Sequence, residues 1–91
     1  MKIVYKKILP EYFSEVIDGN KTFELRKDED NFQVGDIIVL QEYNIDRREY
    51  TGRKIKVIVT YVLRNVPQYG LNNGYCVFSI KPINEDVYNE V

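Results

Sequence analysis

The stretch that decides the fold reads Gly19-Asn20-Lys21-Thr22-Phe23-Glu24-Leu25-Arg26. Gly19 is suited to the left-handed backbone conformation that ends a helix. After it, Phe23 and Leu25 alternate with polar residues, which is the period of a strand with one apolar and one polar face. The stretch therefore predicts the end of a short helix and the start of a strand. It places a lysine at the strand entrance, and a carboxylate and a guanidinium on the polar face.

These three charged residues, Lys21, Glu24 and Arg26, allow two interpretations. Proteins build polar binding and catalytic sites from charged side chains that are held on rigid elements such as strands. Alternatively, Glu24 and Arg26 form a solvated surface ion pair, which contributes less than about 1 kcal/mol to stability. The spacing alone leaves both interpretations open.

Length and composition predict one folded domain with a small core. The chain has 91 residues, of which 44% are hydrophobic and 30% charged, so it has enough apolar residues to fold. No apolar stretch approaches the roughly 20 residues of a membrane span, and no signal peptide is visible. We therefore expect no membrane partner. Cys76 is the only cysteine, which suits a reducing interior and a cytoplasmic location.

The residue types exclude several kinds of chemistry. The sequence has no histidine and one cysteine, so we expect no metal site and no cofactor. A Ser-His-Asp or Cys-His mechanism is excluded.

Charge is unevenly distributed along the chain. The formal net charge of −1 argues against a dedicated duplex binder, because such proteins are usually basic. Residues 47–64, however, carry six basic side chains against one acidic side chain, a net +5, whereas residues 84–91 carry three acidic side chains and no basic one. Arg53 and Lys54 in the basic segment are candidate ligand-binding residues. The alternative is that this segment is a solvated hairpin.

Periodicity predicts five strands, one helix and a minor helical turn. The strands are expected at Lys2–Ile8, Lys21–Arg26, Ile37–Tyr43, Arg53–Arg64 and Tyr75–Lys81, the helix between Leu9 and Gly19, and the helical turn at Gln68–Leu71. Asn44–Gly52 is expected to be a polar hairpin connection.

Two local details complete this prediction. In the fourth strand, Ile55, Val57, Val59, Tyr61 and Leu63 are expected to share one face. In the stretch Phe32-Gln33-Val34-Gly35-Asp36, the glycine is expected to take a positive φ and both apolar side chains to tuck under as anchors.

These elements predict an α+β fold that is mainly β. Five strands in so short a chain, several of them buried on both faces, indicate a small closed or half-closed barrel with the helix covering one opening. Residues 1–83 form this single domain. Residues 84–91 are expected to form an acidic C-terminal tail, either loose or docked as a short segment.

Three stretches together resemble a known group, the ASCH domains of the PUA-like superfamily. They are Leu9-Pro10-Glu11-Tyr12-Phe13, residues 19–26 and residues 32–36. The closer similarity is to a small bacterial and phage family of stand-alone ASCH-like proteins, which also shows segments like Tyr50–Arg53 and Gly70–Tyr75. The resemblance implies a PUA-like pseudo-barrel, in which the strand after the helix lines a cleft that receives RNA or a nucleoside.

By that resemblance, Lys21, Glu24 and Arg26 line the cleft. The two cations suit a phosphate or a base carbonyl, and Glu24 suits an exocyclic amine. A tyrosine ring could stack on a base. Tyr75 is favoured for this role because neighbouring Gly74 lets a ligand approach closely. The other tyrosines considered are Tyr12, Tyr43, Tyr50 and Tyr69.

The leading function is therefore an RNA- or nucleotide-binding module. The first alternative is a small amidohydrolase acting on an acylated cytidine, with Lys21 and Glu24 as its catalytic proton-transfer pair. Against it, Glu24 stands where such enzymes carry a threonine, and the fifth strand has no carboxylate. Many relatives of the wider group also carry a histidine in the first strand, near Val4, and this chain has none. The second alternative is a phage or bacterial accessory protein that binds another protein.

Overall fold

The computed structural model describes residues 1–83 and 88–89. In chain order, its elements are β1 (Ile3–Ile8), α1 (Pro10–Ile17), β2 (Phe23–Lys27), β3 (Ile37–Asn44), β4 (Glu49–Leu63), the 3-10 turn η1 (Pro67–Tyr69), β5 (Tyr75–Pro82) and β6 (Tyr88–Asn89). The five predicted strands, the helix and the helical turn are confirmed, with bounds that shift by a few residues. The predicted acidic tail at 84–91 lies outside the described residues except for β6, which pairs with β4.

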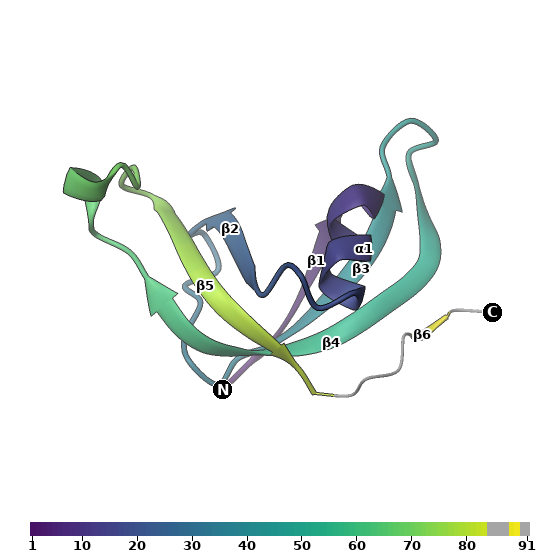
Figure 1. The fold of residues 1–91 in the computed structure, drawn as a ribbon, viewed down its shortest axis with the longest axis horizontal. Helices are drawn as coiled ribbons and strands as arrows, with labels where there is room; N and C mark the ends of the chain where they lie inside the picture. Colours follow the sequence, from purple (N-terminus) through teal and green to yellow (C-terminus); the bar gives the residue numbers. More distant parts are fainter. Residues whose placement is uncertain (84–87, 90–91) are drawn as a thin grey trace.

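The strands form one curled sheet. The order along it is β1-β3-β4-β5-β2, with β1 parallel to β3 and the other neighbours antiparallel. Figure 1 shows the long strand β4 bending through both halves of the sheet, with α1 inside the curve beside β1 and β3. The prediction of a mainly-β half-closed barrel with one helix is confirmed. The two strands at the ends of the order, β1 and β2, keep one unpaired edge each among the described residues.

Helix α1 covers the concave face because its sequence is amphipathic. Pro10 occupies the first turn, where a missing N–H costs nothing. Phe13 and Val16 lie about one helical turn apart on the same face of the helix. Both side chains are buried in the core. They belong to one hydrophobic core with Phe32, from the turn before β3, and with inward-facing residues of the sheet, namely Ile8, Ile38, Leu40, Ile55, Val57, Val59, Cys76, Phe78 and Ile80.

The prediction that one face of the fourth strand continues to Leu63 is wrong. The pairing of β4 with β5 shifts register between Val59 and Tyr61. A bulge adds one residue and therefore moves every later side chain to the opposite face. Tyr61 and Leu63 are exposed, and Val62 packs against the core in their place.

The predicted hairpin connection at Asn44–Gly52 is too long. Strand β3 runs to Asn44 and β4 begins at Glu49, so Tyr43 and Tyr50 are paired across the two strands. Their rings make an edge-to-face contact with centroids 5.1 Å apart. Cross-strand aromatic pairs of this kind stabilise a hairpin, and they extend the ladder into a stretch that looks polar in sequence.

The turn before β3 has one apolar anchor instead of the predicted two. Phe32 is fully buried, whereas Val34 is exposed. The buried Asp36 carboxylate holds the turn, because it accepts hydrogen bonds from the Gln33 backbone N–H at 2.8 Å and from the Lys2 ammonium at 2.6 Å. Gly35 takes the expected positive φ, at +95°.

Across residues 1–83 and 88–89, no helix combines the length and the apolar character needed to cross a membrane.

Candidate functional site

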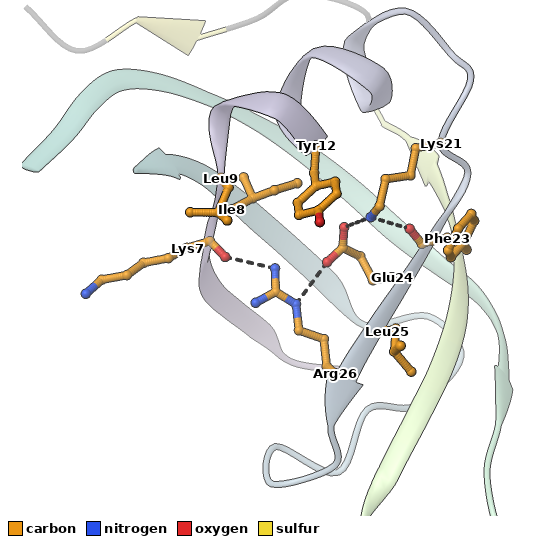
Figure 2. A pocket seen from close by; sticks show the side chains of 9 residues that line it. All are labelled: Lys7, Ile8, Leu9, Tyr12, Lys21, Phe23, Glu24, Leu25 and Arg26. Carbon is orange, nitrogen blue, oxygen red and sulfur yellow. Dashed lines mark hydrogen bonds and ion pairs between the residues drawn. The ribbon is translucent and has the colours of Figure 1, made fainter. Parts of the chain in front are cut away.

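A pocket of about 430 Å³ opens where the free edges of β1 and β2 approach each other beside α1. Figure 2 shows that β2 contributes one side of this pocket, and that the end of β1 and the start of α1 contribute the other. One hydrogen bond spans the gap, from Arg26 Nη2 on β2 to the Lys7 carbonyl oxygen on β1, at 2.8 Å. The pocket therefore lies along the seam where the curled sheet comes closest to closing.

A buried carboxylate with two cationic partners lies at this seam. Glu24 is 3% exposed. Its Oε1 accepts a hydrogen bond from the Lys21 ammonium, and its Oε2 accepts one from Arg26 Nε at 2.9 Å. Lys21 also donates to the Phe23 carbonyl oxygen at 2.7 Å. Figure 2 shows these contacts as one connected network, which we call the Glu24 triad (Lys21, Glu24 and Arg26). It combines two cationic side chains with one carboxylate.

The loop between α1 and β2 fixes the position of Lys21. Gly19 has a φ of +79° and turns the chain out of the helix. The backbone N–H groups of Asn20 and Lys21 then both donate to the Glu15 carbonyl oxygen at 3.0 Å. Lys21 is thus tied to the helix end by its backbone and to Glu24 by its side chain.

The pairing of β2 with β5 sets which face of β2 points inward. Glu24 lies opposite Phe78, a core residue, so its side chain also points inward. Phe23 and Leu25 point outward and are 48% and 57% exposed. The alternation seen in the sequence is present, but its polar face is the one turned inward.

The rest of the pocket wall is mostly apolar. Ile8, Leu9 and Tyr12 line it from the side of β1 and α1, and the outward-facing Phe23 and Leu25 border it along β2. The Lys21 ammonium lies 5.9 Å from the Tyr12 ring centroid and 5.2 Å from that of Phe23, within the range of cation–π attraction. The triad is therefore flanked by two aromatic rings.

The structure brings Lys21, Glu24 and Arg26 together, as the sequence predicts, but it places the other predicted site residues elsewhere. Tyr75 pairs with Lys27, at the other end of β2, and does not line the pocket. Arg53 lies over the Phe13 ring and 3.8 Å from the buried Glu42 carboxylate. Lys54 is the next residue along β4, with Gln41 as its cross-strand partner. Whether these three residues bind a ligand stays a prediction.

The sequence does not predict most of the residues that form the pocket wall. The sequence favours Tyr75 over Tyr12 for stacking on a base. It gives no indication that Ile8, Leu9 or the Lys7 carbonyl lines the site. A signal for Tyr12 exists, because it lies three residues after Leu9 and so next to the apolar face of the helix. The β1 residues carry no such signal, since they meet β2 only through the curl of the sheet.

A second, partly buried polar cluster stabilises the turn after β2. Arg64 donates to both Asp28 carboxylate oxygens and to the Phe32 carbonyl oxygen. The hydrogen bond from Arg64 lowers the pKa of the Asp28 carboxyl. Burial raises the pKa of the nearby Cys76 thiol to about 11, so the thiolate that would act as a nucleophile is scarce at neutral pH. We interpret this cluster as structural.

Among the described residues, no group of three or more His, Cys, Asp or Glu side chains is arranged to hold a metal ion.

Comparison with known proteins gives two matches. A family model described as "Domain of unknown function (DUF3850)" matches residues 5–80. An uncharacterized 12.9 kDa protein in the GpA 3′ region of Escherichia phage P2 is 36% identical over 61 residues, which is 67% of this chain and 54% of the phage protein. The chain therefore spans about half the length of the curated relative it matches.

Proposed function

Because the chain belongs to the DUF3850 family, whose description states no function, we propose from its pocket that it binds a nucleotide-like ligand or single-stranded RNA. The observation that carries the proposal is a buried carboxylate held between two cations in an apolar-walled pocket. We further propose that the half-barrel is a PUA-like domain of the ASCH type. The order of the quoted motifs and the position of the strand after the helix support this assignment.

The size and the lining of the pocket support a small organic ligand. Its volume of about 430 Å³ lies within the range of roughly 300–1,000 Å³ that is common for ligand sites. Such sites combine apolar walls with a few convergent polar groups. The walls and the Glu24 triad supply both.

The triad keeps hydrogen-bond donors available. A guanidinium has five N–H donors and an ammonium has three. Arg26 Nη1 has no partner among the described residues, and Lys21 uses two of its donors. These remaining donors suit a phosphate or a base carbonyl. Glu24 holds both cations in place before any ligand arrives, which lowers the entropy lost on binding.

Tyr12 is the tyrosine best placed to stack on a base. Its ring lines the pocket and projects from α1 toward the triad (Figure 2). Base–aromatic stacking contributes about 1–3 kcal/mol per base and tolerates any base. A flat ring with polar edges, such as a nucleobase, fits walls and donors of this kind.

The test is a fluorescence anisotropy titration with a labelled single-stranded RNA of about 12 nucleotides, at about 50 and 200 mM salt. We expect affinity to fall steeply with salt, because phosphate contacts release counterions. Lys21→Met should weaken binding about tenfold, which corresponds to about 1.4 kcal/mol. Lys27→Met is the matched control, because Lys27 lies on the same strand but is exposed and outside the pocket.

Two results would contradict the proposal. One is the absence of RNA binding by the folded protein. The other is an equal loss of affinity in Lys21→Met and Lys27→Met, which would indicate general charge attraction without a site.

A second candidate function is hydrolysis of an acylated cytidine, favoured by the direct contact between the Lys21 ammonium and the Glu24 carboxylate. Such a pair can transfer a proton. The lining contains no serine, threonine or cysteine among the described residues, and this candidate assigns Lys21 and Glu24 to proton transfer, so it takes water as the nucleophile. Turnover of an acylated cytidine that disappears in Lys21→Met would support this candidate, and no turnover by folded protein would remove it.

A further inference from the structure

A second hollow of about 420 Å³ adjoins the pocket. It is lined by Tyr5, Lys6, Lys7, Arg26, Gln41 and Tyr50. Three of these residues are consecutive on β1, and the others come from β2, β3 and β4, so the hollow extends across neighbouring strands of the sheet. Lys7 and Arg26 line both cavities, and the hydrogen bond between the Arg26 guanidinium and the Lys7 carbonyl forms part of the boundary between them.

The charges in this hollow favour an anion. Its lining includes three cationic side chains and no carboxylate. Lys6 is paired with Asp30 at 2.8 Å, and Arg26 is paired with Glu24. The Lys7 ammonium makes no ion pair among the described residues and lies 4.3 Å from the Tyr43 ring centroid. Figure 2 shows the Lys7 side chain leading away from the Glu24 triad.

Two exposed aromatic rings line the same hollow. Tyr5 is 61% and Tyr50 is 48% exposed. Both lie on strands, and Tyr50 is braced by its edge-to-face contact with Tyr43. A ring held on a strand can stack on a base with little loss of conformational entropy.

We propose that this hollow is a second nucleotide subsite, so that the ligand is a single strand of at least two nucleotides. One base occupies the pocket of the Glu24 triad, and the next stacks on Tyr50 or Tyr5. The phosphodiester between them lies at Lys7 and Arg26, the residues shared by the two cavities. This inference rests on the proposed function, because it presumes that the first pocket takes a nucleotide.

The test is isothermal titration calorimetry with the four nucleoside 3′-monophosphates and the four matching RNA homodinucleotides. We expect the best dinucleotide to bind at least about tenfold more tightly than its mononucleotide, because a second base stacks. Tyr50→Ala should remove that gain and leave the mononucleotide affinity within about twofold. Lys7→Met, which keeps the backbone carbonyl, should weaken both ligands, because the 3′-phosphate of the mononucleotide and the phosphodiester of the dinucleotide occupy the same place at Lys7 and Arg26.

Tyr69→Ala is the matched control, since Tyr69 is 82% exposed in η1 and lines neither cavity. It should leave both affinities unchanged, and thermal unfolding of each variant verifies its fold. The inference is overturned if dinucleotides bind no more tightly than mononucleotides, or if the gain survives Tyr50→Ala. Failure of the proposed function looks different, because then neither ligand binds.

Discussion

At the scale of single residues, Glu24 shows what a local sequence pattern predicts and what it omits. Alternation at residues 22–26 predicts a strand and puts Glu24 beside Arg26, and both features are present. Alternation does not say which face points inward. Register with β5 decides that, because a slip of one residue would exchange the two faces. The desolvation cost of the buried carboxylate is offset by its two cationic partners.

Tyr12 lines the pocket and Tyr75 does not, although the sequence favours Tyr75. Gly74 beside Tyr75 is a sound local reason to expect a ligand nearby. The structure uses Gly74 as a turn residue with a φ of +89°, and its carbonyl oxygen accepts from the Asp28 N–H at 2.8 Å. A glycine needed for backbone geometry and one needed for ligand access look alike in a sequence.

A pH prediction follows from Asp28. Its pKa is lowered in the folded state, first by the hydrogen bond from Arg64. The stabilisation is therefore complete above the unfolded pKa, about 3.9, and is lost as the pH falls through the folded value. Asp28→Asn should destabilise the protein at pH 7 and progressively less as the pH falls below about 4.

Urea unfolding from pH 7 down to about pH 2.5 measures this difference. Glu29→Asn serves as the control, because Glu29 is the exposed neighbour of Asp28. A difference in unfolding free energy between wild type and Asp28→Asn that stays constant over this range would contradict the assignment.

At the scale of elements, the sequence predicts which segments form strands better than it predicts how they pair. Strand periodicity is local, so all five main strands are found. The bulge in β4 depends on its pairing with β5. At the bulge, the hydroxyls of Thr60 on β4 and Ser79 on β5 lie 2.7 Å apart. The extension of β3 and β4 to Tyr43 and Tyr50 likewise depends on a contact across the sheet. Both features are non-local, so neither has a signal within one strand.

The turn before β3 allows an element-scale prediction about Gly35. Its φ of +95° is strained for residues with a side chain, although a Cβ there would meet no atom within 4 Å. Gly35→Val should therefore destabilise the protein by about 1–3 kcal/mol through backbone strain alone. Gly35→Asn should cost less, because asparagine tolerates positive φ better than a β-branched residue does.

Chemical denaturation of the two variants checks this ordering. A Gly35→Val protein as stable as the wild type, or one more stable than Gly35→Asn, would show that the turn does not require a positive φ.

At the scale of the whole molecule, the curvature of the sheet creates the site. The sheet curls until the free edge of β2 approaches that of β1, and the pocket lies along this seam. The Glu24 triad could be predicted because its members lie within six residues of one another. The wall from β1 could not be derived from local patterns, because only the curl of the half-barrel brings Ile8 and Lys7 to face β2.

The central claim is that this seam receives a nucleotide-like ligand. The most direct measurement is an NMR titration that follows the backbone amide signals of the protein as single-stranded RNA of about 12 nucleotides is added. The account predicts that signals of residues 7–9, 11–12 and 21–26 shift together and saturably, while those of residues 61–64 and 68–71, which line neither cavity, stay in place. Shifts confined to the second group, or none at all with folded protein, would contradict it.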